Sequence, residues 1–301
     1  MTEKRDIEFI SGGMTCRGWM FEAGGTGPAP CVVLAHGFCG TKEMRLDAYA
    51  ERFAGAGYHA LVFDYRHFGD SDGYPRQILD IRKQLEDWRA AISYAGSRKE
   101  INSRKIIAWG TSFSGGHVAV MAAEGRNLAA AISQVPHLNG PGTAMAAGFL
   151  QGLRLGIASL RDMGRKITGR EPFYVPALGK PGELAAMTAP GEFEASRKLM
   201  PEGTKEVNEL VAARIFLSLP RYSPGKLAGR IKIPWLIQVA EKDRTTPCEP
   251  AVKAAKKAAK ASFLTYPVGH FEVYVPPWFD RVVADQIAFL KKHVPPSEDK
   301  G

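Results

Sequence analysis

Apolar and polar positions along the chain follow a rhythm that is typical of alternating strands and helices. Short apolar runs have the composition of strands that are buried on both faces of a sheet. Segments with an apolar residue every three or four positions lie between these runs and predict helices. The predicted strands are residues 31–35, 58–64, 106–109, 129–135, 235–239 and 262–266, and the predicted helices are residues 43–56, 77–94, 249–261, 278–293 and one that begins near residue 113.

Two further runs, residues 7–10 and 16–21, alternate apolar and polar side chains around a Ser-Gly-Gly turn, which predicts an opening hairpin. Beyond this hairpin the regular alternation of strand and helix predicts a parallel sheet with helices on both faces.

This rhythm stops after residue 135 and resumes at residue 231. A connection of that length argues for an inserted element rather than a loop. We therefore expect a core formed by residues 1–135 and 231–301, with residues 136–230 as the insert. Within the insert, apolar spacing predicts helices over residues 145–160 and 206–217.

The composition indicates one large folded core rather than a disordered or nucleic-acid-binding chain. Of the 301 residues 45% are hydrophobic and 24% are charged, which excludes global disorder. The 40 basic and 31 acidic residues give a formal net charge of +9, but the charges are scattered and no basic–aromatic interleaving is present. We therefore expect no nucleic-acid partner.

The cysteines and the N-terminal residues bear on cofactors and location. Cys16, Cys31, Cys39 and Cys248 are too few and too irregularly spaced for a disulfide framework or a zinc site. No sequence feature requires an organic cofactor, so we expect neither a metal nor a cofactor. The N-terminus lacks the apolar region of a signal peptide, and no run is long enough to span a membrane. These features predict a cytoplasmic protein with no stable membrane association.

The most informative stretch surrounds Ser112. The apolar run at residues 106–109 ends at Gly110, and a helical pattern starts near Phe113. A serine between small residues at such a junction is typical of a nucleophile elbow, a sharp turn that lifts the hydroxyl above the sheet. Ser114 stands where the usual G-x-S-x-G pattern has its second glycine. Two alternatives are a glycine-rich turn without chemistry and Ser114 as the nucleophile.

A serine nucleophile needs a base and a carboxylate that orients the base, and candidates for both follow later strands. Asp243 comes after the strand at residues 235–239, and His270 comes after the strand at residues 262–266. The carboxyl ends of parallel strands meet at one edge of a sheet, where ligands gather. For Asp243 the alternatives are a helix cap and the replacement of its role by the neighbouring Glu241.

From about residue 8 to residue 293 the chain resembles the α/β-hydrolases of the serine esterase, lipase and aminopeptidase type. Four features, in order, carry the resemblance: His36-Gly37-Phe38, Asp64-Tyr65-Arg66 with Gly69 and Ser71, Gly110-Thr111-Ser112-Phe113-Ser114, and Asp243 to Pro247 with Gly269-His270. The resemblance implies an α/β-hydrolase fold with a mostly parallel eight-stranded sheet, helices on both faces and an inserted helical lid at residues 136–230.

The resemblance also implies the roles of individual residues. Ser112 would attack an acyl carbonyl, His270 would act as general base and then as general acid, and Asp243 would hold the imidazole in its tautomer. The backbone N–H groups of Phe38 and Phe113 would form the oxyanion hole.

The insert, placed like the lid of this family, suggests the substrate class. Its methionine, leucine and phenylalanine residues favour an apolar pocket for a small acyl substrate. Three residues are predicted to contact the substrate, namely His137, Met145 and Phe149. For His137 the alternative is a place in a surface loop.

We expect hydrolysis of a carboxylic ester through an acyl-enzyme intermediate. The alternatives are thioester hydrolysis or acyl transfer, and a prolyl-type aminopeptidase. The non-enzyme alternative is a hydrolase-fold ligand receptor. The sequence leaves open whether the protein is a monomer or a homodimer.

Overall fold

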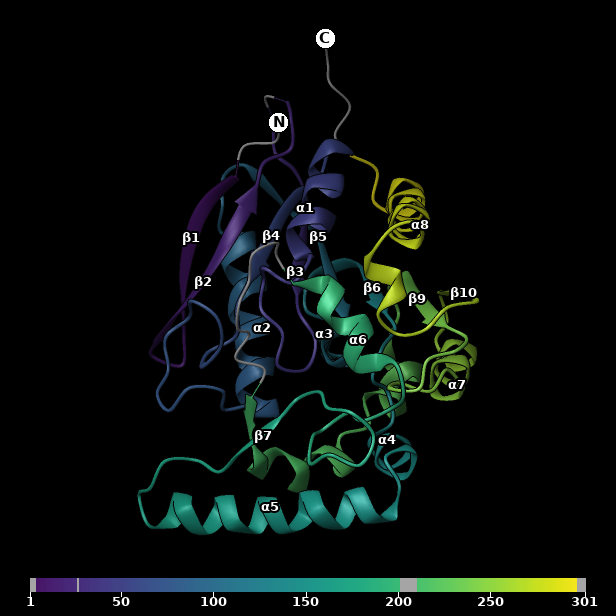
Figure 1. The fold of residues 1–301 in the computed structure, drawn as a ribbon. Helices are drawn as coiled ribbons and strands as arrows, with labels where there is room; N and C mark the ends of the chain where they lie inside the picture. Colours follow the sequence, from purple (N-terminus) through teal and green to yellow (C-terminus); the bar gives the residue numbers. More distant parts are fainter. Residues whose placement is uncertain (1–3, 26, 201–209, 297–301) are drawn as a thin grey trace.

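The computed structural model describes residues 4–25, 27–200 and 210–296. Its main sheet has eight strands in the order β1-β2-β4-β3-β5-β6-β9-β10 (Figure 1). β1 and β2 form an antiparallel hairpin and β2 pairs antiparallel with β4, whereas the other neighbouring strands are parallel. The mostly parallel eight-stranded sheet is therefore confirmed. Its strands are β1 Lys4–Ser11, β2 Met14–Phe21, β3 Ala29–Ala35, β4 His59–Phe63, β5 Ile101–Thr111, β6 Leu128–Gln134, β9 Trp235–Ala240 and β10 Ala261–Tyr266.

Helices cover both faces of this sheet because successive strand side chains point to opposite sides. In β3, Val33 faces the core that α2, α3 and α7 share, and its neighbour Val32 faces the core beneath α1 and α8. Both valines are fully buried, so both faces exclude water. The five helices are α1 Leu46–Gly55, α2 Ile81–Gly96, α3 Phe113–Glu124, α7 Glu249–Lys257 and α8 Trp278–His293.

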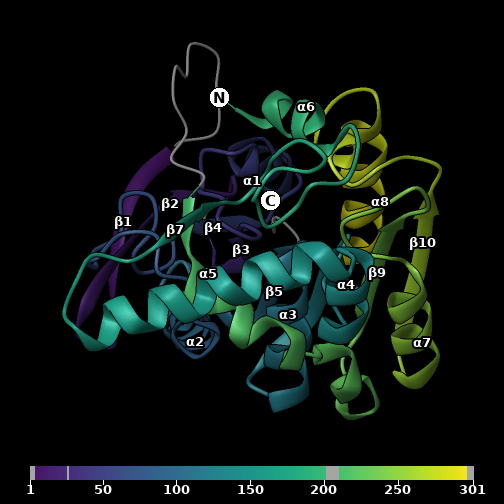
Figure 2. The ribbon, with the colours of Figure 1, turned by 60° about the horizontal axis from the view of Figure 1, so that its bottom comes forward.

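The segment between β6 and β9 forms one long helix and several short elements. The long helix, α5, runs along the bottom of Figure 1 and crosses in front of β5 and α3 in Figure 2. It buries Leu155 and Ala158, and its Asp162 pairs with Arg214, whose Nε lies 2.7 Å from the carboxylate. The elements are α4 Gly140–Ala146, α5 Phe149–Ile167, β7 Tyr174–Pro176, α6 Glu192–Ser196, β8 Leu210–Ala212 and the 3₁₀ segments Arg197–Leu199, Ala213–Leu217, Leu219–Arg221 and Pro224–Arg230.

Both helix predictions for this segment need correction. The predicted helix at residues 145–160 is divided between α4 and α5, because Gly148 has a φ of +83° that a continuous helix does not allow. Of the predicted helix at 206–217, residues 206–209 lie outside the described part of the chain. The remainder is β8, which pairs with β7, followed by a 3₁₀ turn. Strand pairing here overrides the helical spacing of the apolar residues.

Two helices of the core begin later than predicted. The helix predicted from residue 77 begins at Ile81, because the Asp80 side chain accepts hydrogen bonds from the N–H groups of Arg82 and Lys83 and caps the first turn. The helix predicted from residue 43 begins at Leu46.

Candidate active site

Ser112 lies in the turn that joins β5 to α3, and its backbone conformation is unusual for a residue with a side chain. Its φ is +54° and its ψ is −118°. The turn is tight, since a Cβ atom at Gly110 would lie 2.4 Å from the carbonyl oxygen of Ser114. Only glycine fits between strand and helix at that point. The sharp strand-to-helix turn predicted from the small residues is present.

Ser114, the alternative nucleophile, has a different environment. Its side chain is fully buried, and its Oγ lies 2.7 Å from the Tyr65 hydroxyl and 3.2 Å from Nε1 of Trp88, which donates to it. These bonds hold Ser114 in the packing between α3 and α2, and they favour Ser112 as the serine that faces the site.

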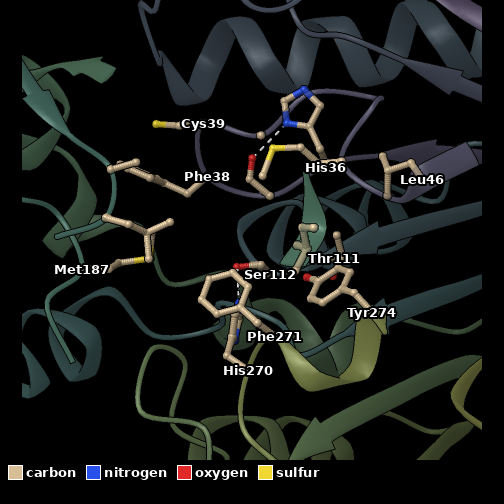
Figure 3. A pocket seen from close by; sticks show the side chains of 16 residues that line it. His36, Phe38, Cys39, Leu46, Thr111, Ser112, Met187, His270, Phe271 and Tyr274 are labelled. Atoms are coloured by element: carbon tan, nitrogen blue, oxygen red, sulfur yellow. Dashed lines mark hydrogen bonds between the residues drawn. The ribbon is translucent and has the colours of Figure 1, made fainter. Parts of the chain in front are cut away.

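The side chains of Ser112, His270 and Asp243 form a continuous hydrogen-bonded chain. Nε2 of His270 lies 3.1 Å from Oγ of Ser112, and Nδ1 of His270 lies 2.7 Å from Oδ2 of Asp243. All three side chains are buried. Figure 3 shows the Ser112 hydroxyl and the His270 ring pointing toward each other. Contacts of this length are what proton transfer from a serine to a histidine requires.

The loop after β9 holds Asp243 rigidly. Oδ1 accepts hydrogen bonds from the backbone N–H groups of Thr245 (2.8 Å) and Thr246 (2.7 Å), and the Thr246 hydroxyl donates to Oδ2 at 2.8 Å. Asp243 thus closes a local turn and also pairs with His270. It is not a helix cap, because α7 begins after Cys248 without a side-chain cap, and the competing Glu241 is exposed. Sequence reasoning missed Thr246, although threonine just after aspartate is a known signal for such turns.

The electrostatic surroundings of His270 favour its protonated form. Burial alone acts to lower the pKa of His270, but the charge of Asp243 and the hydrogen bond to it outweigh burial, and the pKa is raised. Glu192, a buried carboxyl of α6, acts in the same direction, and desolvation raises the pKa of Glu192 itself. Sequence reasoning missed Glu192, because only the fold of the 136–230 segment carries it to His270.

The loop after β3 brings Phe38 beside Ser112 and Phe113. A Cβ atom at Gly37 would lie 2.8 Å from Cβ of Ser112, so glycine is needed for this approach. The rings of Phe38 and Phe113 meet edge to face with centroids 5.8 Å apart. Within this loop, Nδ1 of His36 lies 3.0 Å from the Gly37 carbonyl oxygen. Phe38 and Phe113 therefore lie beside Ser112, and the role of their backbone N–H groups as oxyanion donors stays a prediction.

Two small cavities meet at Ser112, and Phe38 and Met187 line both of them. Each has a volume of about 50 Å³, which holds a few water molecules but no long acyl chain. The first, named the apolar compartment, is lined by residues 36–40 and by Met44, Leu46, Thr111, Ser112, Ala177, Leu178, Met187, Leu199, His270, Phe271 and Tyr274 (Figure 3). The second, named the His137 compartment, is lined by Phe38, Ser112, Phe113, His137, Thr143, Ala186, Met187, Leu219, Thr245 and Thr246.

The three residues predicted to contact substrate have different locations. Met145 and Phe149 line neither compartment and are 81% and 89% exposed. His137 lines the His137 compartment and is only 3% exposed. Its alternative placement in a surface loop is wrong, because the rings of Tyr222 and Phe113 cover it.

The side chains and helices of the described ranges, 4–25, 27–200 and 210–296, bear on metal binding and on membrane spanning. Within these ranges no group of three or more His, Cys, Asp or Glu side chains is arranged to hold a metal ion. No helix in the same ranges combines the length and apolar character needed to cross a membrane.

Comparison with known proteins establishes the class of protein that this fold and site define. The model of the alpha/beta hydrolase family matches residues 32–286, and the chain therefore belongs to the alpha/beta hydrolase family.

Individual relatives match almost the whole chain. Quorum-quenching protein AidA of Acinetobacter baumannii (strain MDR-ZJ06) is 43% identical over 290 residues, which are 96% of this chain and 95% of that protein. Polyketide transferase grgF of Penicillium sp is 26% identical over 298 residues, 97% of each chain. The crystal structure of alpha/beta hydrolase GrgF from Penicillium sp. sh18 superposes with a TM-score of 0.81 at 24% identity, over 97% of this chain and 99% of that one.

A shorter match involves thiohydrolase aneE of Aspergillus aculeatus (strain ATCC 16872 / CBS 172.66 / WB 5094). It is 38% identical over 111 residues, which are 36% of this chain and 34% of that protein.

Proposed function

We propose that this protein is a serine hydrolase that cleaves a carboxylic ester of a small substrate through an acyl-enzyme intermediate. The observation that carries the proposal is the hydrogen-bonded chain from Ser112 through His270 to Asp243, with contacts of 3.1 and 2.7 Å where two cavities meet. Membership of the alpha/beta hydrolase family supports a hydrolytic activity.

In the proposed mechanism, His270 takes the proton of the Ser112 hydroxyl as the serine oxygen attacks the ester carbonyl. Asp243 stabilises the imidazolium that forms. The N–H groups of Phe38 and Phe113 donate to the carbonyl oxygen as it becomes negative. His270 then protonates the leaving alcohol, which leaves an acyl group on Ser112.

Water completes the cycle. With the alcohol gone, His270 removes a proton from a water molecule, which attacks the acyl carbonyl and forms a second tetrahedral intermediate. His270 returns the proton to the serine oxygen as the carboxylic acid leaves, and Ser112 is restored.

We propose that residues 136–230 act as a lid over this site. Ala177, Leu178, Met187 and Leu199 of this segment line the apolar compartment. Cavities of about 50 Å³ are too small for a long acyl chain, so we expect this segment to move when such a substrate enters.

The relatives favour particular acyl bonds. The relative named quorum-quenching protein AidA supports a bacterial signal molecule as the source of the ester. The match to a thiohydrolase supports thioester hydrolysis as the second candidate, because a thioester carbonyl is attacked by the same serine and needs the same oxyanion donors.

The test is the comparison of two serine variants. Ser112→Ala is expected to lower kcat for short p-nitrophenyl esters by about 10⁵- to 10⁶-fold and to prevent labelling by a fluorophosphonate probe. Ser114→Ala is the matched control, and it is expected to keep the labelling, since Ser114 is bonded to Tyr65 and Trp88 rather than to His270. Unchanged turnover or labelling in Ser112→Ala refutes the proposal. A wild-type protein that neither turns over esters nor reacts with the probe, but binds ligands, points to a receptor instead.

A further inference from the structure

Helix α5, which runs along the outside of the molecule (Figure 1), exposes a row of large apolar side chains. They are between 51% and 89% exposed, and they are Phe149, Leu150, Leu153, Ile157, Leu160 and Ile167. A folded monomer rarely exposes so much contiguous apolar surface unless the surface is an interaction site. Phe149 lines neither compartment beside Ser112, so substrate binding does not account for the row.

The spacing along this row is typical of the contact between two helices. Residues separated by three and four positions in strict alternation, here named the seam, are Leu150, Leu153, Ile157, Leu160, Gly164 and Ile167, and all six are exposed. This heptad spacing gives the narrow apolar stripe of a coiled coil. The residues that α5 buries, among them Leu155, Ala158 and Asp162, lie on the opposite side of the helix. A second helix can therefore pack along the seam without meeting the body of the protein.

The arginines beside the seam turn their charges back onto their own protein. Arg154 donates to the carbonyl oxygen of Gly182 at 2.9 Å, and the guanidinium of Arg161 lies 4.3 Å from the ring centroid of Phe173. Arg165 likewise donates to a backbone carbonyl oxygen. A helix that binds an anionic lipid surface presents free basic side chains to the headgroups. This face offers apolar contact instead, which favours a protein helix over a lipid surface as its partner.

The size and composition of the face favour a second copy of this chain. A large apolar residue has about 200 Å² of surface, so the six exposed apolar residues of α5 present roughly 800 Å². Each partner in a stable complex contributes about 800 Å². The seam contains no charged residue that would need an opposite charge on a different protein. Because α5 is already folded on its own chain, pairing requires no new helix to form.

We propose that the seam of α5 pairs with the seam of α5 in a second copy of this chain, antiparallel across a two-fold axis. In this pair Leu150 faces the partner's Ile167, Leu153 faces the partner's Gly164, and Ile157 faces the partner's Leu160. A Cβ atom at Gly164 would meet nothing within 4 Å, and the partner's Leu153 fills this space. A parallel pair would oppose glycine to glycine and leave a void there. The inference is independent of the proposed function, since no residue of the seam belongs to the hydrolytic site.

The first test measures the mass of the full chain in solution by sedimentation velocity at micromolar concentrations. The wild type is expected to have twice the mass of one chain. Ile157→Glu places like charges at the centre of the pair and is expected to raise the dissociation constant of the dimer about 100-fold or more. Ile157 is 61% exposed, so this variant should stay folded, which circular dichroism checks. Ile10→Glu is the matched control, since Ile10 is 66% exposed but lies on β1, and it is expected to keep the wild-type mass.

The second test determines the orientation of the two helices by oxidative crosslinking of cysteine variants. In the antiparallel pair, residue 150 of one chain faces residue 167 of the other, whereas the two copies of residue 150 are about 25 Å apart. A mixture of Leu150→Cys and Ile167→Cys is therefore expected to form a crosslinked dimer, and neither variant is expected to form one by itself. The wild type is the control for crosslinking through the native thiols, which are those of Cys16, Cys31, Cys39 and Cys248.

Four outcomes overturn this inference. A wild type with the mass of one chain shows that the seam does not pair with a second copy, and binding of that monomer to phosphatidylglycerol vesicles identifies the face as a lipid-docking surface instead. A dimer that Ile157→Glu does not weaken forms through another surface. Crosslinking of Leu150→Cys with itself shows a parallel pair. Ester hydrolysis by the wild type is measured separately, and its absence refutes the proposed function without bearing on the dimer.

Discussion

The strained backbone of Ser112 predicts that one inactive variant is more stable than another. Ser112 has φ +54° and ψ −118°, a conformation that residues with a Cβ rarely adopt and glycine adopts readily. Backbone hydrogen bonds hold it there, since its N–H donates to Gln134 and its carbonyl accepts from Gly115 and His137. Ser112→Ala and Ser112→Gly both remove the hydroxyl, but only Ser112→Gly relieves the strain.

The expected size of the difference follows from two opposing terms. A residue held in such a region costs about 1–3 kcal/mol. The greater conformational freedom of glycine in the unfolded chain offsets about 0.5–1 kcal/mol of the relief. The bond from Ser112 Oγ to His270 is lost in both variants and cancels in the comparison. We therefore expect Ser112→Gly to exceed Ser112→Ala in free energy of unfolding by about 0.5–2 kcal/mol.

Equilibrium urea unfolding of the two variants measures this difference directly. The control is Ala90→Gly in the middle of α2, where the backbone is helical and the same change of residue should destabilise by about 0.5–1 kcal/mol. A gain in free energy of unfolding from alanine to glycine at position 112, together with a loss at position 90, supports backbone strain at the turn. A Ser112→Gly variant that is no more stable than Ser112→Ala refutes the reasoning, whatever its activity.

Two other predictions follow from the geometry. The midpoint of the acidic limb in the pH profile of kcat/KM for ester hydrolysis should lie above pH 6.5, because Asp243 raises the pKa of His270. Asp243→Asn removes that charge but leaves the burial that lowers the pKa, so the midpoint should move to lower pH while the rate falls about 10⁴-fold. A midpoint that stays in place or moves to higher pH contradicts this prediction. Gly110→Ala should lower the free energy of unfolding by about 3 kcal/mol and abolish activity, since its Cβ would lie 2.4 Å from the Ser114 carbonyl oxygen. The control is Gly152→Ala in α5, where a Cβ meets nothing within 4 Å. This control variant should be neutral or slightly stabilising in the same unfolding assay.

The order of strands and helices in the core was predictable from the sequence because it depends on local patterns. An apolar run such as 31–35 can be buried on both faces only inside a covered sheet, and the structure places it there. The turn at Ser112 was also predictable from the sequence, because a strand and a helix that approach so closely require small residues at the junction. Asp243 and His270 were located by their positions after strands, since parallel strands end at one edge.

The tertiary structure alone decided the features that depend on contacts between distant segments. β8 became a strand because β7 pairs with it, although its apolar residues have helical spacing. Glu192 and Thr246 reached His270 without any pattern in the sequence that links them to it. The pattern of apolar and polar residues describes the neighbourhood of a residue along the chain. The pattern carries no information about which other segment of the chain covers that residue. For this reason the burial of His137, which the surface-loop alternative excluded, and the exposed positions of Met145 and Phe149 away from both compartments came from the tertiary structure alone.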